Sequence, residues 1–84
     1  MATDTARMQA NDILIKRQIG TSTQSDGVRE FYTLHRYPNG ERFAGPWNDE
    51  RHARDEGRRH GEADGVGFWL EDGPDTNNYH LISD

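Results

Sequence analysis

The chain has 84 residues, which is enough for one domain and too few for two. Its formal net charge of -5 disfavours nucleic acids and anionic lipid surfaces as partners, because an acidic protein is repelled by their phosphates. The chain contains no cysteine, which excludes disulfide bonds and thiolate metal sites.

The first part of the chain predicts a tail followed by two strands. Residues 1–11 are polar and small and lack periodicity, which predicts a disordered tail ahead of a single domain at 12–84. Residues 12–20 place Ile13, Ile15 and Ile19 at alternate positions, with Lys16 and Gln18 on the other face, which indicates a half-buried strand. Residues 28–37 are rich in aromatic and β-branched residues, which predicts a second strand after a polar loop.

A hairpin turn is expected at Pro38-Asn39-Gly40. Asn and Gly tolerate the positive φ angles that a tight turn requires. A short third strand is therefore expected at 41–44, and Gly45-Pro46 is expected to end it.

A helix is predicted from about residue 49 to residue 64. Asn48 is a suitable N-cap, and Gly65 is suited to the left-handed conformation that ends many helices. One stripe of this helix is small and contains Gly57, so an aromatic ring from the sheet is expected to pack over that glycine: Phe43, Trp47 or Phe68.

Two further strands are expected after the helix. Residues 66–71 are apolar on both faces, which favours an interior strand or a surface that meets a partner, and residues 79–82 form a last short strand. The fold class that follows is α+β: a small antiparallel sheet of three to five strands packed on one α-helix, in the order β-β-β-α-β-(β).

The aromatic residues suggest a protein-interaction module without catalytic residues. They make up 10% of the chain, which is more than one small-faced helix can cover, so part of the sheet is expected to expose aromatic side chains. Tyrosine and tryptophan are enriched among the residues that anchor protein partners. The expected partner is another protein or a second copy of the chain, and the expected contact residues are Tyr32, Tyr37, Trp69 and Tyr79.

The alternative to this exposed aromatic face is that the tail or the last strand covers it. In that case the aromatic residues on this side of the sheet belong to the core. The first residues lack the apolar stretch of a secretory signal, and no apolar run reaches the roughly 18 residues of a membrane span. A cytoplasmic protein that does not bind membranes is therefore expected.

Nucleic-acid binding is a second hypothesis. Three strands followed by a helix resemble the layout of plant AP2-type and integrase-arm DNA-binding domains, in which the sheet contacts DNA. The contact residues would be Arg36, Arg42 and the helix arginines Arg51, Arg54, Arg58 and Arg59. The competing interpretation is a helix with exposed salt bridges, which would join Arg51 to Asp55 and Arg58 to Glu62.

A divalent-metal site on the helix is the third hypothesis. His52, Glu56 and His60 follow at intervals of four residues, and each neighbouring pair shares a helix face. A metal normally needs three or four ligands, and His35 and His80 on other segments could supply further ones, but both helix histidines cannot reach one ion across two helical turns. No metal ligand, cofactor or catalytic residue is therefore predicted.

Overall fold

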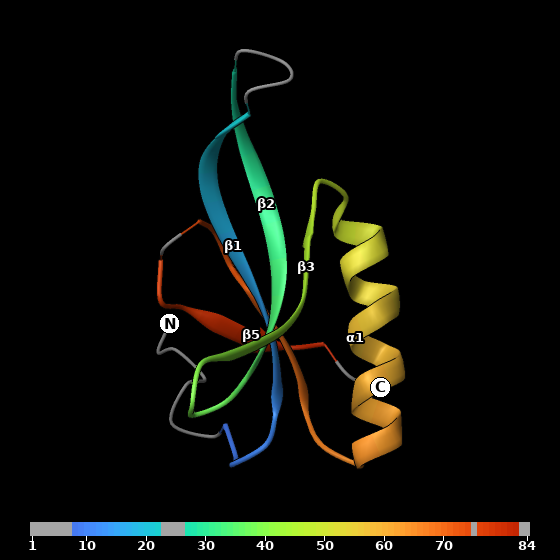
Figure 1. The fold of residues 1–84 in the computed structure, drawn as a ribbon. Coiled ribbons are helices and arrows are strands. Elements are labelled where there is room, and N and C mark those ends of the chain that lie inside the picture. Colours follow the sequence, from blue (N-terminus) through green and yellow to red (C-terminus); the bar gives the residue numbers. More distant parts are fainter. Residues whose placement is uncertain (1–7, 23–26, 75, 83–84) are drawn as a thin grey trace.

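The protein is described by a computed structural model, which covers residues 8–22, 27–74 and 76–82. Five strands form one mixed sheet, and a single helix packs on one of its faces (Figure 1). This arrangement confirms the predicted α+β class with a small sheet on one helix. The elements follow in chain order as β1 (Ile13–Ser22), β2 (Gly27–Arg36), β3 (Glu41–Trp47), α1 (Glu50–Asp64), β4 (Phe68–Glu71) and β5 (Tyr79–Leu81).

The strand β1 lies at the centre of the sheet, whose order is β3-β2-β1-β4-β5. β1 pairs antiparallel with β2 and parallel with β4, while β4 and β5 are antiparallel. The sheet is therefore mixed, where the sequence predicted an antiparallel one. The parallel pair arises because α1 crosses the sheet and returns the chain to the end at which β1 starts.

The strand β3 continues through Gly45 and Pro46 to Trp47, although these two residues were expected to end it. β3 is an edge strand, where a proline without an N–H group removes no ladder hydrogen bond. The pairing with β2 shifts register in this region, and Gly45 has a φ of 110°. A Cβ atom there would lie 3.0 Å from the Tyr32 carbonyl oxygen, so the irregular strand requires glycine.

The helix α1 begins one residue later than predicted. Asp49 is its N-cap, and its side chain accepts a hydrogen bond from the Arg51 backbone N–H at 2.9 Å. The predicted Gly65 ends the helix in the left-handed conformation with a φ of 67°. The ring of Phe68 lies against Gly57, as the small helical stripe predicted, because a Cβ atom there would stand 2.2 Å from Phe68 Cε1.

The main core lies between the sheet and α1. Alternate residues of β1 and β2 face the helix, together with two residues of β4. Its buried members are Ile13, Ile15, Tyr32, Leu34, Ala53, Phe68 and Leu70.

A second, smaller apolar cluster lies on the opposite side of the sheet, which we call the distal face. Met8, Leu14 and Trp69 are its buried members, and Tyr37 and Tyr79 pack against them. Residues 8–11 were predicted to belong to a disordered tail, but Met8 is buried in this cluster and the Asn11 N–H donates to the Tyr37 carbonyl at 2.7 Å. Residues 1–7 lie outside the described residues.

Candidate functional site

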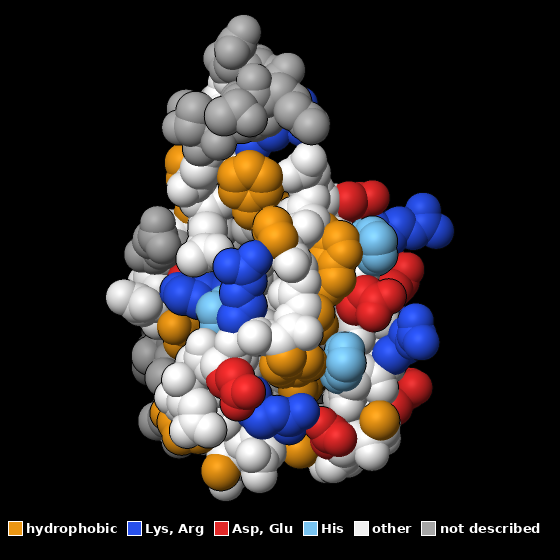
Figure 2. Space-filling view, viewed as in Figure 1, with side chains coloured by type: hydrophobic (Ala, Val, Ile, Leu, Met, Phe, Trp, Pro, Cys, Tyr) orange, Lys and Arg blue, Asp and Glu red, His pale blue; other side chains and the backbone are white. Residues whose placement is uncertain are grey.

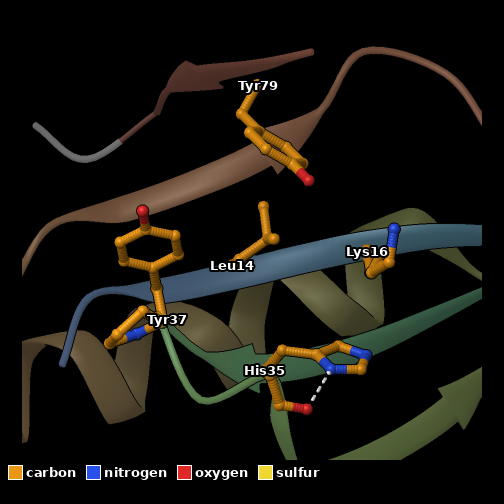
Figure 3. A pocket seen from close by; sticks show the side chains of 7 residues that line it. Leu14, Lys16, His35, Tyr37 and Tyr79 are labelled. Atoms are coloured by element: carbon orange, nitrogen blue, oxygen red, sulfur yellow. Dashed lines mark hydrogen bonds between the residues drawn. The ribbon is translucent and has the colours of Figure 1, made fainter. Parts of the chain in front are cut away.

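A hollow with a volume of about 310 Å³ opens on the distal face. Leu14 of β1 lies at its centre, and the rings of Tyr37 and Tyr79 stand on either side of that side chain (Figure 3). Because β1 is the central strand, chain segments that are distant in sequence meet around Leu14. The residues that line the hollow are Leu14, Lys16, His35, Tyr37, Pro38, Gly40 and Tyr79.

The two tyrosine rings come from opposite sides of β1. Tyr37 follows β2, and two backbone hydrogen bonds fix it: its N–H donates to the Asp12 carbonyl at 2.9 Å, and its carbonyl accepts from Asn11. Tyr79 begins β5 and pairs with Glu71 across the β4–β5 ladder. Both tyrosines are half-buried, and both line the hollow and pack against the distal cluster.

Trp69 lies beside Leu14 in the distal cluster and is buried, so it is not an exposed anchor. Only 4% of its surface is accessible, and its indole Nε1–H donates to the Asp12 carboxylate at 2.9 Å. The same carboxylate accepts the backbone N–H groups of Gln9 and Gly67. Met8 of the N-terminal segment packs in the same cluster as Trp69. For Trp69, therefore, the alternative interpretation holds, in which the N-terminal segment covers part of this face.

Tyr32 lies on the helix side of the sheet and is 8% exposed. The Arg17 guanidinium stands 5.8 Å from the centre of its ring, and it forms an ion pair with Glu30. The hydrogen bond that Arg17 Nε–H donates to the Glu30 carboxylate raises the pKa of Arg17. Burial, followed by the charge of Glu30, raises the pKa of Tyr32. Of the four predicted contact residues, Tyr37 and Tyr79 therefore line the hollow, whereas Tyr32 and Trp69 are core residues.

Lys16 reaches the rim of the hollow from a buried ion pair. Glu71 is fully buried, and it accepts from Lys16 Nζ at 3.3 Å and from the Arg17 backbone N–H at 2.6 Å. β4 ends at Glu71, so this carboxylate takes the place of the carbonyl that a longer strand would offer to β1. A third bond from the Asn77 N–H holds the carboxylate, which limits the positions open to Lys16.

His35 forms a rigid part of the wall. Its Nδ1 donates to the Gly40 carbonyl at 3.0 Å, because a carbonyl oxygen only accepts. In the neutral ring its Nε2 then accepts the hydroxyl proton of the buried Thr33 at 2.7 Å. Both ring nitrogens are engaged, so the imidazole is held in one orientation.

The arginines of the nucleic-acid hypothesis do not form one surface. Arg36 lies on the helix side of the sheet, where it donates to Asp64 at 2.6 Å and its guanidinium stands over the Phe43 ring. Arg42 is the cross-strand partner of His35 and therefore lies on the distal face. Arg51, Arg54, Arg58 and Arg59 belong to α1, on the other side of the sheet.

The salt bridges along α1 differ from the expected ones. Arg54 pairs with Glu50 at 2.8 Å and Arg59 pairs with Glu56 at 3.4 Å. Within the described parts of the chain, the expected pairs Arg51–Asp55 and Arg58–Glu62 are absent from the ion pairs. The helix carboxylates neutralise two of its arginines, which weakens α1 as a surface for phosphate groups.

The histidines of the metal hypothesis pack on aromatic rings. His52 lies 5.2 Å from the Trp47 ring centre, and His60 meets the Phe43 ring edge-on at 4.8 Å. His52 also stands 4.0 Å from Glu56. In residues 8–22, 27–74 and 76–82, no three His, Asp or Glu side chains lie where they could hold one metal ion.

The sequence did not single out Leu14, Lys16, His35, Pro38 or Gly40 as site residues. Leu14 and Lys16 alternate with the core isoleucines of β1, so their position on the distal face was readable from the periodicity. That the turn residues Pro38 and Gly40 meet them depends on the β1–β2 register, which no local pattern shows.

Comparisons of this chain with protein-family models, with curated proteins and with solved structures find no match. A search of the described residues for a helix that is long and apolar enough to cross a membrane also finds none.

Proposed function

We propose that this chain is a non-enzymatic protein-interaction module, and that it binds a short segment of a partner protein in the distal hollow. The observation that carries the proposal is an open, apolar depression with Leu14 at its centre and the rings of Tyr37 and Tyr79 as its walls (Figure 3). Binding sites are typically concave and mostly apolar, with a few polar groups that fix orientation. Tyrosine is also enriched among the residues that contribute most to binding.

The rigidity of the walls supports the same function. Hydrogen bonds hold His35 from both ring nitrogens, and Tyr37 is tied to the N-terminal segment through its backbone. Lys16 is restrained by its ion pair with Glu71. Association loses less conformational entropy when the binding surface is already ordered, so a preorganised hollow favours binding.

The state of His35 supports binding without catalysis. A general acid or base needs a ring nitrogen that can reach a substrate, and both nitrogens of His35 already have protein partners. We assign to His35 the role of a wall that excludes water and orients the partner.

Selection from a library of short random peptides displayed on phage tests this function. Peptides enriched on the wild-type protein should lose about tenfold or more in affinity for Tyr79→Ala and for Tyr37→Ser, because each variant removes one wall. Ile19→Ala is the matched control, since Ile19 is an exposed apolar residue on the other face of the sheet. Its affinity for the same peptides should be unchanged.

Two outcomes contradict the proposal. One is that no peptide is enriched on the wild-type protein over the Tyr79→Ala variant. The other is that enriched peptides bind Ile19→Ala as weakly as they bind Tyr79→Ala. Dispersed ¹H–¹⁵N spectra of Tyr79→Ala and Tyr37→Ser ensure that loss of binding is not loss of fold.

A further inference from the structure

Among the residues that the structure describes, the exposed charges on the distal face of β1, β2 and β3 are basic, although the whole chain carries a net charge of -5. Lys16 lies on this face beside Leu14, because the two alternate with the core residues of β1. Gly20 lies on the same face of β1 as Leu14 and Lys16. Arg29 of β2 is the cross-strand partner of Gly20 and therefore also lies on the distal face. Arg29 is exposed.

Arg42 extends this basic surface to the rim of the hollow. It is the cross-strand partner of His35, which lines the hollow, and it is exposed. The side chains of cross-strand partners stand about 5 Å apart at their Cβ atoms. The guanidinium of Arg42 can therefore reach a group that is bound against His35.

The carboxylates that β4 and the residue ahead of β1 place on the distal face, Glu71 and Asp12, are buried. Asp12 is 4% exposed beneath Trp69, and Glu71 is fully buried beneath Lys16. On the helix side, by contrast, α1 carries the exposed Asp55, Glu62 and Asp64 and the half-buried Glu50 and Glu56. In Figure 2 some Lys and Arg side chains on the sheet side stand next to a histidine, and others lie between Asp or Glu side chains at the lower edge, while most Asp and Glu side chains lie on or beside the helix.

We propose that the hollow selects protein segments in which a carboxylate stands next to an apolar side chain. The proposal rests on the function proposed above and adds the chemistry of the partner. The apolar side chain would occupy the space between Tyr37 and Tyr79, over Leu14. The carboxylate would then meet Arg42, which forms no ion pair with any described residue.

The net acidity of the chain does not oppose such a partner at close range. Charges that are more than about 10 Å apart are largely screened at 0.1 M salt, so the helix carboxylates act weakly across the sheet. A carboxylate at the rim responds mainly to the near charges, which are Arg42 and the ion pair of Lys16 with Glu71. Lys16 already forms an ion pair with Glu71, so Arg42 contributes the larger part of the preference for a carboxylate in the partner.

The same geometry favours a peptide over single-stranded nucleic acid. Proteins that bind single strands stack successive bases on exposed aromatic faces along a basic groove. Here Trp69 is buried, and the rings of Tyr37 and Tyr79 are walls of one hollow and do not form a row along a groove. The helix arginines lie on the other side of the sheet and cannot extend the basic surface.

A double-mutant cycle on a peptide from the display selection tests the proposal. Peptides that depend on Tyr79 should share an Asp or Glu beside an apolar residue. Arg42→Gln should weaken a synthetic copy of such a peptide by about two- to fivefold, as expected for a solvent-exposed ion pair. Replacing the peptide's acidic residue with its amide should have the same effect on the wild-type protein and little further effect on Arg42→Gln.

Arg58→Gln is the matched control, because Arg58 is an exposed arginine of α1 and its replacement changes the net charge equally. It should leave affinity unchanged. Peptides that depend on Tyr79 but contain no shared acidic residue, or that bind Arg42→Gln normally, would overturn the inference and leave the proposed function standing. If no peptide requires Tyr79 for binding, both this inference and the proposed function would be overturned. Displacement of the peptide by a short oligothymidylate, in a manner that requires Arg42, would assign the surface to nucleic acid instead.

Discussion

Two glycines on the same face of α1 should respond in opposite ways to an added methyl group. Gly57 and Gly61 are both buried and lie one helical turn apart. A Cβ atom at Gly57 would stand 2.2 Å from Phe68 Cε1 and 2.6 Å from Cζ. A Cβ atom at Gly61 would meet only Phe68 Cβ at 3.8 Å and the Val66 carbonyl at 3.7 Å, which are ordinary contacts.

The expected free energies of unfolding follow from these distances. Replacing glycine with alanine inside a helix stabilises it by about 1 kcal/mol, and Gly61→Ala should gain that amount. Gly57→Ala gains the same helical preference but overpacks the core, which costs about 1–3 kcal/mol. Phe68 is only 3% exposed and cannot swing into solvent, so the cost should lie at the upper end and leave a net loss of about 2 kcal/mol.

Thermal unfolding followed by circular dichroism measures both effects. For a domain of this size, 1 kcal/mol corresponds to a change of about 4–8 °C in Tm. The Tm of Gly61→Ala should rise by about that much, and the Tm of Gly57→Ala should fall by about 8–16 °C. An equal rise for both variants would contradict the close packing of Phe68 on the helix.

Three further changes test other parts of the structure. Glu71→Ala leaves the partly buried N–H groups of Arg17 and Asn77 without their acceptor and should lower the free energy of unfolding by about 1–3 kcal/mol in urea titrations. An equally large loss for the exposed Glu62→Ala would argue against that cause. Burial raises the pKa of Tyr32 in the folded state above its ordinary value of 10.0. The stability that the neutral hydroxyl contributes is therefore complete below pH 10.0, and it is lost as the pH rises through the folded-state pKa. Tyr32→Phe should therefore flatten the alkaline fall in stability, and an unchanged fall would assign it to other groups. Asp12→Asn replaces an acceptor of the Trp69 indole N–H, so the ¹H–¹⁵N peak of that indole should shift strongly while the Trp47 indole peak stays in place.

The features that the sequence predicted correctly depend on neighbouring residues. Gly40 adopts the positive φ that the hairpin turn requires, and Gly65 ends α1 in the left-handed conformation. The small stripe of α1 with Gly57 at its centre was enough to predict a packed ring from the sheet. Each of these follows from backbone preferences or helical periodicity within a few residues.

The features that the sequence missed depend on residues that are far apart in the chain. Trp69 became a core residue because Asp12, 57 positions earlier, accepts its indole N–H. β4 runs parallel to β1 because α1 reverses the chain, a fact about topology that no strand pattern contains. β3 passes through Pro46 because that strand lies at the edge of the sheet, which depends on the strand order.

The candidate site was predicted only in part, because most of its residues meet through contacts between distant parts of the chain. Tyr37 and Tyr79 were identified from residue type alone, because tyrosine is common at interfaces. Lys16, His35 and Arg42 join them only through the β1–β2 and β2–β3 registers. A register cannot be derived from the composition of either strand, so the basic character of the distal face was not visible in a chain that is acidic overall.

Chemical-shift mapping with a peptide from the display selection tests the central claim most directly. ¹H–¹⁵N spectra of the labelled protein are recorded as the peptide is added. If the distal hollow is the binding site, the backbone amides that shift should cluster at Leu14, Lys16, His35, Gly40 and Tyr79, and those of α1 should stay in place. Shifts concentrated on α1, with the amides around the hollow unchanged, would contradict the assignment of the distal face as the interaction surface.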